Sequence, residues 1–190
     1  MGKADTHLHT QYSGYSKLGV MKFPESVISP QMQVDKGRKN GMDVIAITDH
    51  DETRAAFIAQ EYAKKYDDIE VIVGEEILTT KGEILAVFVK EELPKGIEPL
   101  EAFKRLRDQN AFISLSHPYA PMRHGWTEAE MEEFLPWLDA IEIANARNIP
   151  EMNRSAIDFA AAHGLCGTAG SDAHGLRELG AMGLSLPDFH

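Results

Sequence analysis

The stretch Ala4-Asp5-Thr6-His7-Leu8-His9 joins a short apolar run to two histidines near the start of a 190-residue chain. Residues two apart in an extended segment point to the same side, so the two imidazoles face one point while Leu8 packs away from it. Asp172-Ala173-His174 repeats this spacing near the other end of the chain. Imidazole nitrogens together with carboxylate oxygens suit Zn²⁺, Mn²⁺ or Fe²⁺, so both segments are candidates for a metal site.

Short apolar runs recur along the chain, and most of them lack polar alternation. Runs of this kind are typical of strands that are covered on both faces. They span residues 4–8, 43–48, 69–74, 84–89, 111–115, 140–143, 165–169 and 181–186. Amphipathic segments separate them, with helix-start residues such as Ser29-Pro30 and the Thr127–Glu130 capping box. This alternation predicts a parallel α/β architecture, either an open sheet or a closed barrel.

Polar side chains follow nearly every predicted strand, and this favours the barrel. All parallel strands of a barrel end at one face, where active sites form. The side chains concerned are His7, His9, Asp49, His50, Glu75, Glu76, His117, Glu142, Asn145, Asp172 and His174. We therefore expect a single-domain barrel of about seven strands over residues 1–190, with these groups gathered at one end.

Composition narrows the classes of function. A net charge of −11 argues against stable binding to nucleic acid, which requires clustered Lys and Arg. No apolar run approaches the roughly 18 residues of a membrane span, and no secretory signal opens the sequence. The single cysteine, Cys166, excludes an internal disulfide. We expect a cytoplasmic protein that does not associate with membranes.

Five ordered motifs resemble those of the polymerase and histidinol phosphatase (PHP) superfamily. They lie at residues 5–10, 47–50, 74–76, 116–118 and 170–174, and the resemblance extends over nearly the whole chain. It implies a distorted seven-stranded (β/α)7 barrel of the TIM type, two to three divalent metal ions and phosphoesterase activity.

The resemblance also implies which residues bind metal. The first metal would be held by His7, His9, Glu75 and Asp172. Glu75 would bridge to a second metal that His117 also binds, because one carboxylate can reach two cations and one histidine cannot. His50 and His174 would reach a third metal, and such a histidine is also a candidate to assist the leaving oxygen.

Two positions depart from the family pattern. Gly14, in Tyr12-Ser13-Gly14-Tyr15-Ser16, stands where many members have an Asp or His, which leaves the third metal site incomplete. Glu83 stands where many members have a histidine; it is either a substitute ligand or an acid at a strand end. Arg123, in the loop after His117, is the candidate phosphate-binding residue because a guanidinium offers paired donors.

The expected function is hydrolysis of a phosphate ester by water that metal ions activate. The expected substrate is a small phosphomonoester, a nucleotide or the 5′-terminal phosphate of a short oligonucleotide. Two alternatives stay open. An amidohydrolase-type metal hydrolase also begins with His-x-His, but typically bridges its metals with a lysine. A non-catalytic accessory domain of a polymerase would bind metal without turnover.

Overall fold

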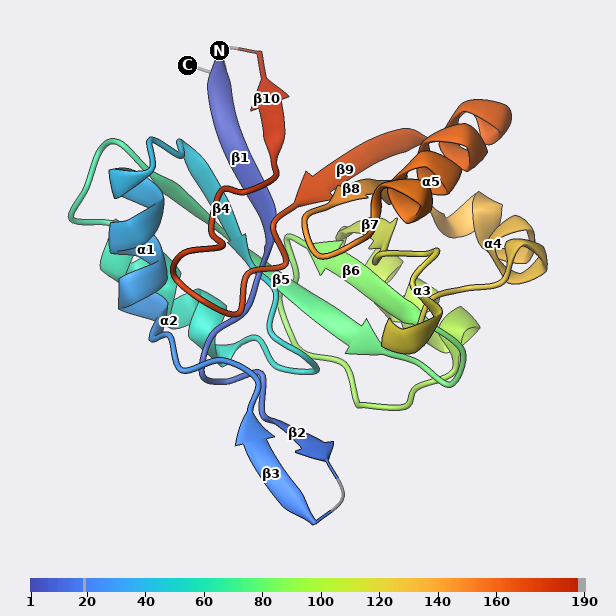
Figure 1. Cartoon of the computed structure of the whole chain (residues 1–190), viewed down its shortest axis with the longest axis horizontal. Coiled ribbons are helices and arrows are strands. Elements are labelled where there is room, and N and C mark those ends of the chain that lie inside the picture. Colours follow the sequence, from blue (N-terminus) through green and yellow to red (C-terminus); the bar gives the residue numbers. More distant parts are fainter. Residues whose placement is uncertain (19, 188–190) are drawn as a thin grey trace.

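The structure, a computed structural model, describes residues 1–18 and 20–187 (Figure 1). Its main sheet has the strand order β10-β1-β4-β5-β6-β7-β8-β9. The strands span β1 (Gly2–Leu8), β4 (Val44–Ile47), β5 (Glu70–Leu78), β6 (Glu83–Val87), β7 (Phe112–Leu115), β8 (Ala140–Asn145), β9 (Cys166–Gly170) and β10 (Leu184–Leu186). Each of the eight predicted apolar runs overlaps one of these strands, and β10, in the run 181–186, lies at the edge of the sheet.

The sheet curves into a barrel because the end of β9 returns beside β1. The N–H of Asp172 donates to the carbonyl of His7 at 2.9 Å, and the N–H of His9 donates to Ala173 at 3.0 Å. Gly170 permits this approach, since a Cβ at that position would lie 2.4 Å from the Cβ of His7. The predicted distorted, TIM-like α/β barrel is confirmed, with eight strands in place of seven.

Two strands run antiparallel to their neighbours, contrary to the expectation of a parallel sheet. β6 pairs antiparallel with β5 and β7, and β10 pairs antiparallel with β1. Only residues 79–82 join β5 to β6, whereas a crossover to a parallel neighbour needs about a dozen residues or more. The beginning of β6, and with it Glu83, therefore lies at the face where the parallel strands end.

Five α-helices surround the sheet in the described part of the chain, and two of them begin at the predicted helix-start residues Ser29-Pro30 and Thr127. They are α1 (Pro30–Lys39), α2 (Arg54–Ala63), α3 (Pro99–Asp108), α4 (Glu128–Phe134) and α5 (Pro150–His163). The Ser29 hydroxyl accepts from the N–H of Met32, and Thr127 and Glu130 form the predicted capping box. Within the described residues, no helix combines the length and the apolar character that a membrane crossing needs.

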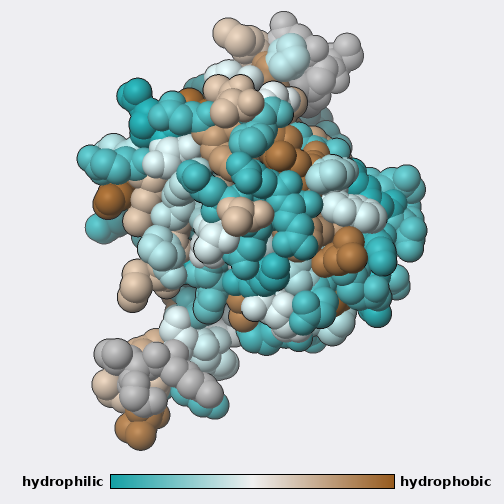
Figure 2. Space-filling model, turned by 90° about the vertical axis from the view of Figure 1, so that its right-hand side faces the viewer, coloured by the Kyte–Doolittle hydropathy of each residue, from teal (hydrophilic) through white to brown (hydrophobic). Residues whose placement is uncertain are grey.

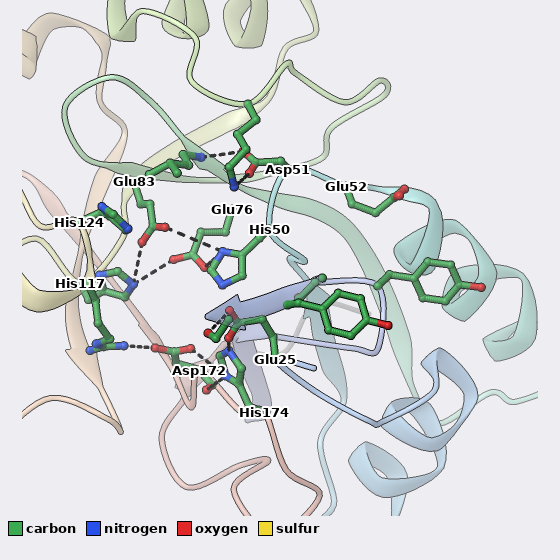
Figure 3. Close-up of a pocket in the computed structure, with 18 of the residues that line it drawn as sticks. Glu25, His50, Asp51, Glu52, Glu76, Glu83, His117, His124, Asp172 and His174 are labelled. Carbon is green, nitrogen blue, oxygen red and sulfur yellow. Dashed lines mark hydrogen bonds and ion pairs between the residues drawn. The ribbon is translucent and has the colours of Figure 1, made fainter. Parts of the chain in front are cut away.

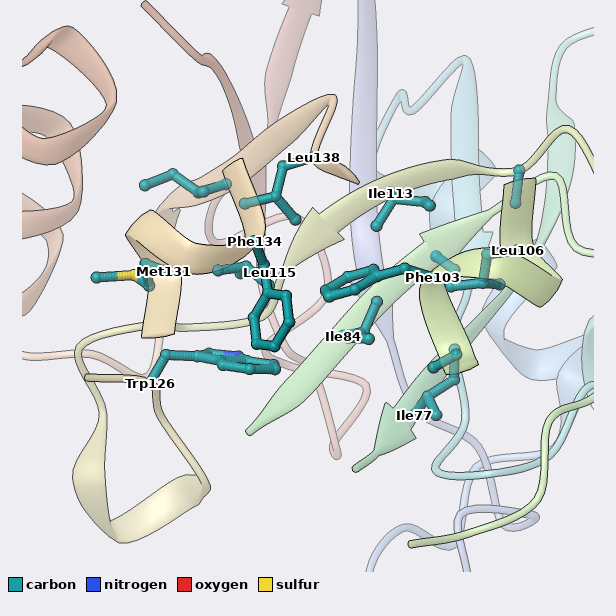
Figure 4. Close-up of a cluster of buried hydrophobic side chains, with 14 of the residues drawn as sticks. Ile77, Ile84, Phe103, Leu106, Ile113, Leu115, Trp126, Met131, Phe134 and Leu138 are labelled. Atoms are coloured by element: carbon teal, nitrogen blue, oxygen red, sulfur yellow. The ribbon is translucent and has the colours of Figure 1, made fainter. Parts of the chain in front are cut away.

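Two hydrophobic clusters hold the helices against the sheet. In one, α3, α4 and α5 cover β6, β7 and β8, and Phe103 packs 5.1 Å from the Phe134 ring (Figure 4). In the other, α1 and α2 cover β4 and β5 around Ile45 and Ile47. Burying one such side chain stabilises the fold by about 1.5–3 kcal/mol. The packed barrel wall therefore holds the residues at its end in position.

A hairpin of β2 (Tyr15–Leu18) and β3 (Met21–Pro24) follows the first motif and was not predicted. It projects from the barrel in Figure 1 and forms the protrusion at the lower left of Figure 2. At its base, the N–H of Glu25 donates to the carbonyl of Gly14 at 3.0 Å. The hairpin thus brings Glu25 back beside the turn that follows β1.

Candidate metal centre

Histidines and carboxylates from separate strands converge at one end of the barrel. A polar cavity of about 690 Å³ opens there. Figure 3 shows His50, Glu76, Glu83 and His117 turned toward one another, with Asp172 and His174 beside them. Three sets of side chains have ligand atoms within 4.8 Å of one another: His7, His9 and Glu76; His50, Glu76 and Glu83; His9, His50 and His174.

The tightest of these groupings surrounds one oxygen of Glu76. Glu76 Oε2 lies 3.3 Å from His7 Nε2, 3.2 Å from His9 Nε2 and 3.0 Å from His50 Nδ1. It has no hydrogen-bond partner among the described residues. His7 Nε2 and His9 Nε2 are themselves 3.0 Å apart. Ligands of a tetrahedral Zn²⁺ lie about 3.4 Å from each other at the usual bond lengths. The donor atoms of His7, His9 and Glu76 therefore fit a shared cation.

The other oxygen of Glu76 faces a different histidine. Glu76 Oε1 lies 3.0 Å from His117 Nε2 and accepts a hydrogen bond from the Ser116 hydroxyl at 2.5 Å. The Glu83 carboxylate lies 3.5 Å from His117 Nε2 and 3.9 Å from His50 Nδ1. Glu76 thus has the placement of a carboxylate that bridges two cations, and Glu83 lies where the predicted substitute ligand would be.

Glu75, the predicted bridging ligand, lies outside this cluster of ligand atoms. Adjacent residues in a strand point to opposite faces of the sheet, so Glu75 and Glu76 cannot both reach the centre. Glu75 instead accepts the N–H of Leu93 at 3.0 Å, and burial raises its pKa to about 8. Val73 and Ile77, which share its face of β5, are core residues. Ile72 and Leu78 share the opposite face with Glu76, so the apolar pattern of this strand does not distinguish the two glutamates.

Hydrogen bonds behind the ligands hold their rings in place. His7 Nδ1 lies 3.0 Å from Glu142 Oε1, and the other oxygen of Glu142 accepts the N–H of His117 at 2.8 Å and the amide of Asn145 at 3.0 Å. Because Glu142 accepts all of these bonds, His7 Nδ1 carries a proton, and His7 Nε2 is the nitrogen that a cation would bind. A carboxylate behind a metal-binding histidine commonly has this role.

Asp172 and His174 approach the same group from the loop after β9. Asp172 Oδ1 lies 3.4 Å from His9 Nε2 and 3.5 Å from His174 Nδ1. Asp172 has a φ of 53°, in the left-handed region that costs energy for a non-glycine residue. The surrounding structure therefore imposes this orientation of the carboxylate.

Glu25 lies beside His174 and was missed from the sequence. Its Oε2 is 3.8 Å from His174 Nε2. Gly14 does stand in place of the expected acid, but the hairpin returns an acid to the same neighbourhood. No motif identifies Glu25, since its position depends on the turn between β2 and β3.

Two arginines lie on the cavity wall beside Asp172. The Arg123 guanidinium, from the 3-10 turn Pro121–Arg123, donates to Asp172 and to Asn148. Arg147, which sequence reasoning missed, lies 2.7 Å from His174 Nδ1 and 3.7 Å from Asp172 Oδ1. Arg123 is thus placed where an anionic substrate group could reach it, and Arg147 provides a second guanidinium.

The electrostatics of the centre fit bound cations. Burial opposes ionisation, but His7 and His50 hold the pKa of Glu76 well below its usual value. The pKa of Glu83 is raised to about 9 by burial and by the charge of Glu76. A divalent cation would remove the repulsion between these two carboxylates. The residues present therefore fit the metal ions that the motifs imply.

Comparison with known proteins agrees with the fold. A family model described as PHP-associated matches residues 150–182. The uncharacterized protein MJ1587 of Methanocaldococcus jannaschii is 37% identical over 144 residues, which cover 76% of this chain and 82% of that protein. The chain belongs to the PHP superfamily. The uncharacterized protein MJ0417 of the same organism is 36% identical to this PHP protein over 114 residues, 57% of the chain and 48% of its relative.

Solved structures share the PHP fold at low sequence identity. A protein of Bifidobacterium adolescentis, assigned to the metal-dependent phosphoesterases, has a TM-score of 0.72 at 16% identity, covering 90% of this chain and 87% of its own. An amidohydrolase from Chromobacterium violaceum has a TM-score of 0.74 at 15% identity, with coverage of 97% and 92%. The lesion-specific endonuclease EndoQ of Pyrococcus furiosus has a TM-score of 0.58 at 14% identity, covering 94% of this chain and 50% of its own. Identities this low establish the shared fold alone.

Proposed function

We propose that this PHP protein is a metal-dependent phosphoesterase. Its substrate would be a small phosphomonoester, a nucleotide or a 5′-terminal nucleic-acid phosphate. The observation that carries the proposal is Glu76, one oxygen of which faces three imidazoles while the other faces a fourth, that of His117. Divalent cations bound between such groups would activate water and neutralise charge on the phosphoryl oxygens.

The donor atoms support two to three cations of the Zn, Mn or Fe type, which favour mixed nitrogen and oxygen ligands. A first cation would be held by His7, His9, Glu76 and Asp172. A second would be held by Glu76, Glu83 and His117. A third would be held by His50, His174 and Glu25, with Glu25 supplying the acid that Gly14 does not.

The remaining roles concern the substrate. Arg123 would bind non-bridging phosphoryl oxygens through paired N–H donors, and Arg147 would add a second positive charge on the same wall. His7 and His9 are fully buried, whereas the side chains of His50 and His174 are 23% and 13% exposed. Either the third cation or one of these two more open histidines would therefore assist the leaving oxygen.

The geometry favours phosphate esters over the amidohydrolase alternative. The bridging position holds a carboxylate rather than a lysine. Among the described residues that line the cavity, the one lysine is Lys95, and its Nζ lies 2.9 Å from Asp51. A lysine engaged in that ion pair is not part of the cluster around Glu76.

A substrate panel with controlled metal content tests the proposal. The protein would be stripped with a chelator, reloaded separately with Zn²⁺, Mn²⁺ or Fe²⁺, and assayed on phosphomonoesters, phosphodiesters, amides and lactones. We expect hydrolysis of phosphate esters by the reloaded protein and its loss in His9→Ala. Turnover of amides or lactones alone would support the amidohydrolase alternative, and bound metal without any turnover would support the accessory domain.

A further inference from the structure

Asp49 is part of a motif that the metal centre does not fully use. It precedes His50, yet its fully buried carboxylate lies outside the ligand cluster. It does not cap α2 either, since that helix begins after Thr53. The carboxylate instead accepts three hydrogen bonds from the turn after β1: from the N–H of Thr10 at 2.5 Å, the hydroxyl of Thr10 at 2.6 Å and the hydroxyl of Ser13 at 2.5 Å.

The bond from Ser13 determines which nitrogen of His9 carries a proton. Ser13 Oγ lies 2.9 Å from His9 Nδ1 and 2.5 Å from Asp49 Oδ1. A serine hydroxyl has one hydrogen, and here that hydrogen forms the hydrogen bond to the Asp49 carboxylate. His9 Nδ1 must therefore donate to Ser13, which leaves the lone pair of His9 on Nε2. That nitrogen faces Glu76 and Asp172.

We infer that Asp49 and Ser13 are positioning residues for His9. The Ser13 hydroxyl relays the charge of Asp49 to His9 Nδ1, and so orients the His9 ring with Nε2 free toward the cation. The inference rests on the proposed metal centre. It also distinguishes the two histidines of the first motif, since His7 has a carboxylate, Glu142, directly behind it.

The main chain of His9 is held independently of this relay. The side-chain amide of Gln33 donates to the carbonyl of His9 at 2.7 Å, and the N–H of His9 donates to Ala173 at 3.0 Å. Loss of the Ser13 hydroxyl should therefore free the ring of His9 while its backbone stays in place. Losing a partner behind a metal-binding histidine typically weakens metal binding about 10–100-fold.

Thr10 provides a matched control for Ser13. Both hydroxyls lie in the same buried turn and donate to the same carboxylate, but only Ser13 also contacts His9. The measurement is the dissociation constant for Zn²⁺, by competition with a chromophoric chelator, for wild type, Ser13→Ala and Thr10→Val. We expect Ser13→Ala to bind Zn²⁺ at least about tenfold more weakly and Thr10→Val to stay within about threefold of wild type.

Two further variants test the Ser13 hydroxyl and the Asp49 carboxylate separately. Ser13→Thr keeps the hydroxyl and should restore wild-type affinity, whereas Asp49→Asn should weaken binding as Ser13→Ala does. Equal affinities in wild type and Ser13→Ala, or equal losses in Ser13→Ala and Thr10→Val, would overturn the relay alone. Absence of Zn²⁺ binding by wild type would instead overturn the metal centre itself.

Discussion

Arg123 and Asp172 form an ion pair at the edge of the metal centre, between the loops that follow β7 and β9. Asp172 also faces His9 and His174, so one carboxylate connects a proposed phosphate-binding residue to the proposed ligands. A substrate phosphate that enters the cavity would offer the guanidinium a second anionic partner beside its aspartate. A substrate that binds Arg123 would therefore also affect the position of Asp172, a proposed metal ligand.

Replacement of Arg123 by alanine should therefore weaken catalysis of phosphate esters. A charged hydrogen bond contributes about 1.5–3 kcal/mol, which corresponds to a roughly 10–100-fold lower kcat/KM. Steady-state kinetics of Arg123→Ala measure this directly. Arg177 follows the last motif but is exposed and does not line the cavity, so Arg177→Ala is the control. Unchanged kinetics in Arg123→Ala would remove the residue from the site.

Removal of metal should lower the stability of the protein. Glu76 and Asp172 are buried carboxylates, and bound cations would neutralise their negative charge. At a free concentration one hundred times its dissociation constant, one cation adds about 2.7 kcal/mol. For a chain of this size that is a Tm difference of roughly 5–10 °C between loaded and chelator-treated protein. Differential scanning calorimetry with and without added Zn²⁺ checks it; coincident melting curves would contradict the presence of a tight site.

Glu25 should be needed for the third cation and not for the other two. Glu25→Gln is expected to lower the affinity for the weakest-bound cation by at least about tenfold. Glu52 lines the same cavity but pairs with Arg54 at 2.8 Å, so Glu52→Gln is the matched control. Metal titration followed by elemental mass spectrometry counts the equivalents. Full retention of every equivalent in Glu25→Gln would exclude Glu25 as a ligand.

Replacement of Gly170 by alanine should disturb both the packing of the barrel and the metal centre. An alanine there would press on the Cβ of His7, and overpacking of this kind costs about 1–3 kcal/mol of unfolding free energy. Gly164, at the end of α5, has a φ of 67° and open space around it, so Gly164→Ala should cost about 1 kcal/mol through strain alone. Denaturant unfolding and metal analysis should show that both variants lose stability and only Gly170→Ala also loses metal.

Much of the fold could be predicted because local signals in the chain agree with it. The apolar runs, the Thr127 capping box and the glycine at position 164 all correspond to elements of the structure. The direction of β6 was not predicted, because it depends on the short connection of residues 79–82 rather than on the apolar run itself. The β2–β3 hairpin was missed because its residues are mostly exposed and carry no burial pattern.

The candidate site likewise contains residues that could be predicted from the sequence and residues that could not. His7 lies at the end of β1, and the other motif residues follow strands that end at the same face, as the motifs predicted: His9, His50, His117, Asp172 and His174. The choice between Glu75 and Glu76 could not be made from the sequence, because apolar residues flank both of them: Val73 and Ile77 on one face of β5, Ile72 and Leu78 on the other. Glu25 and Arg147 could not be predicted from spacing, because loops bring them to the centre.

The central claim is that Glu76 bridges the cations of a catalytic centre, and the most direct test compares it with its neighbour. Glu76→Gln and Glu75→Gln make the same chemical change at adjacent positions on opposite faces of β5. Bound metal by elemental mass spectrometry and phosphate release would be measured on the same samples. We predict that Glu76→Gln loses bound metal and at least about 100-fold of its activity, whereas Glu75→Gln keeps both. Equal behaviour of the two variants, or loss in Glu75→Gln alone, would contradict the account.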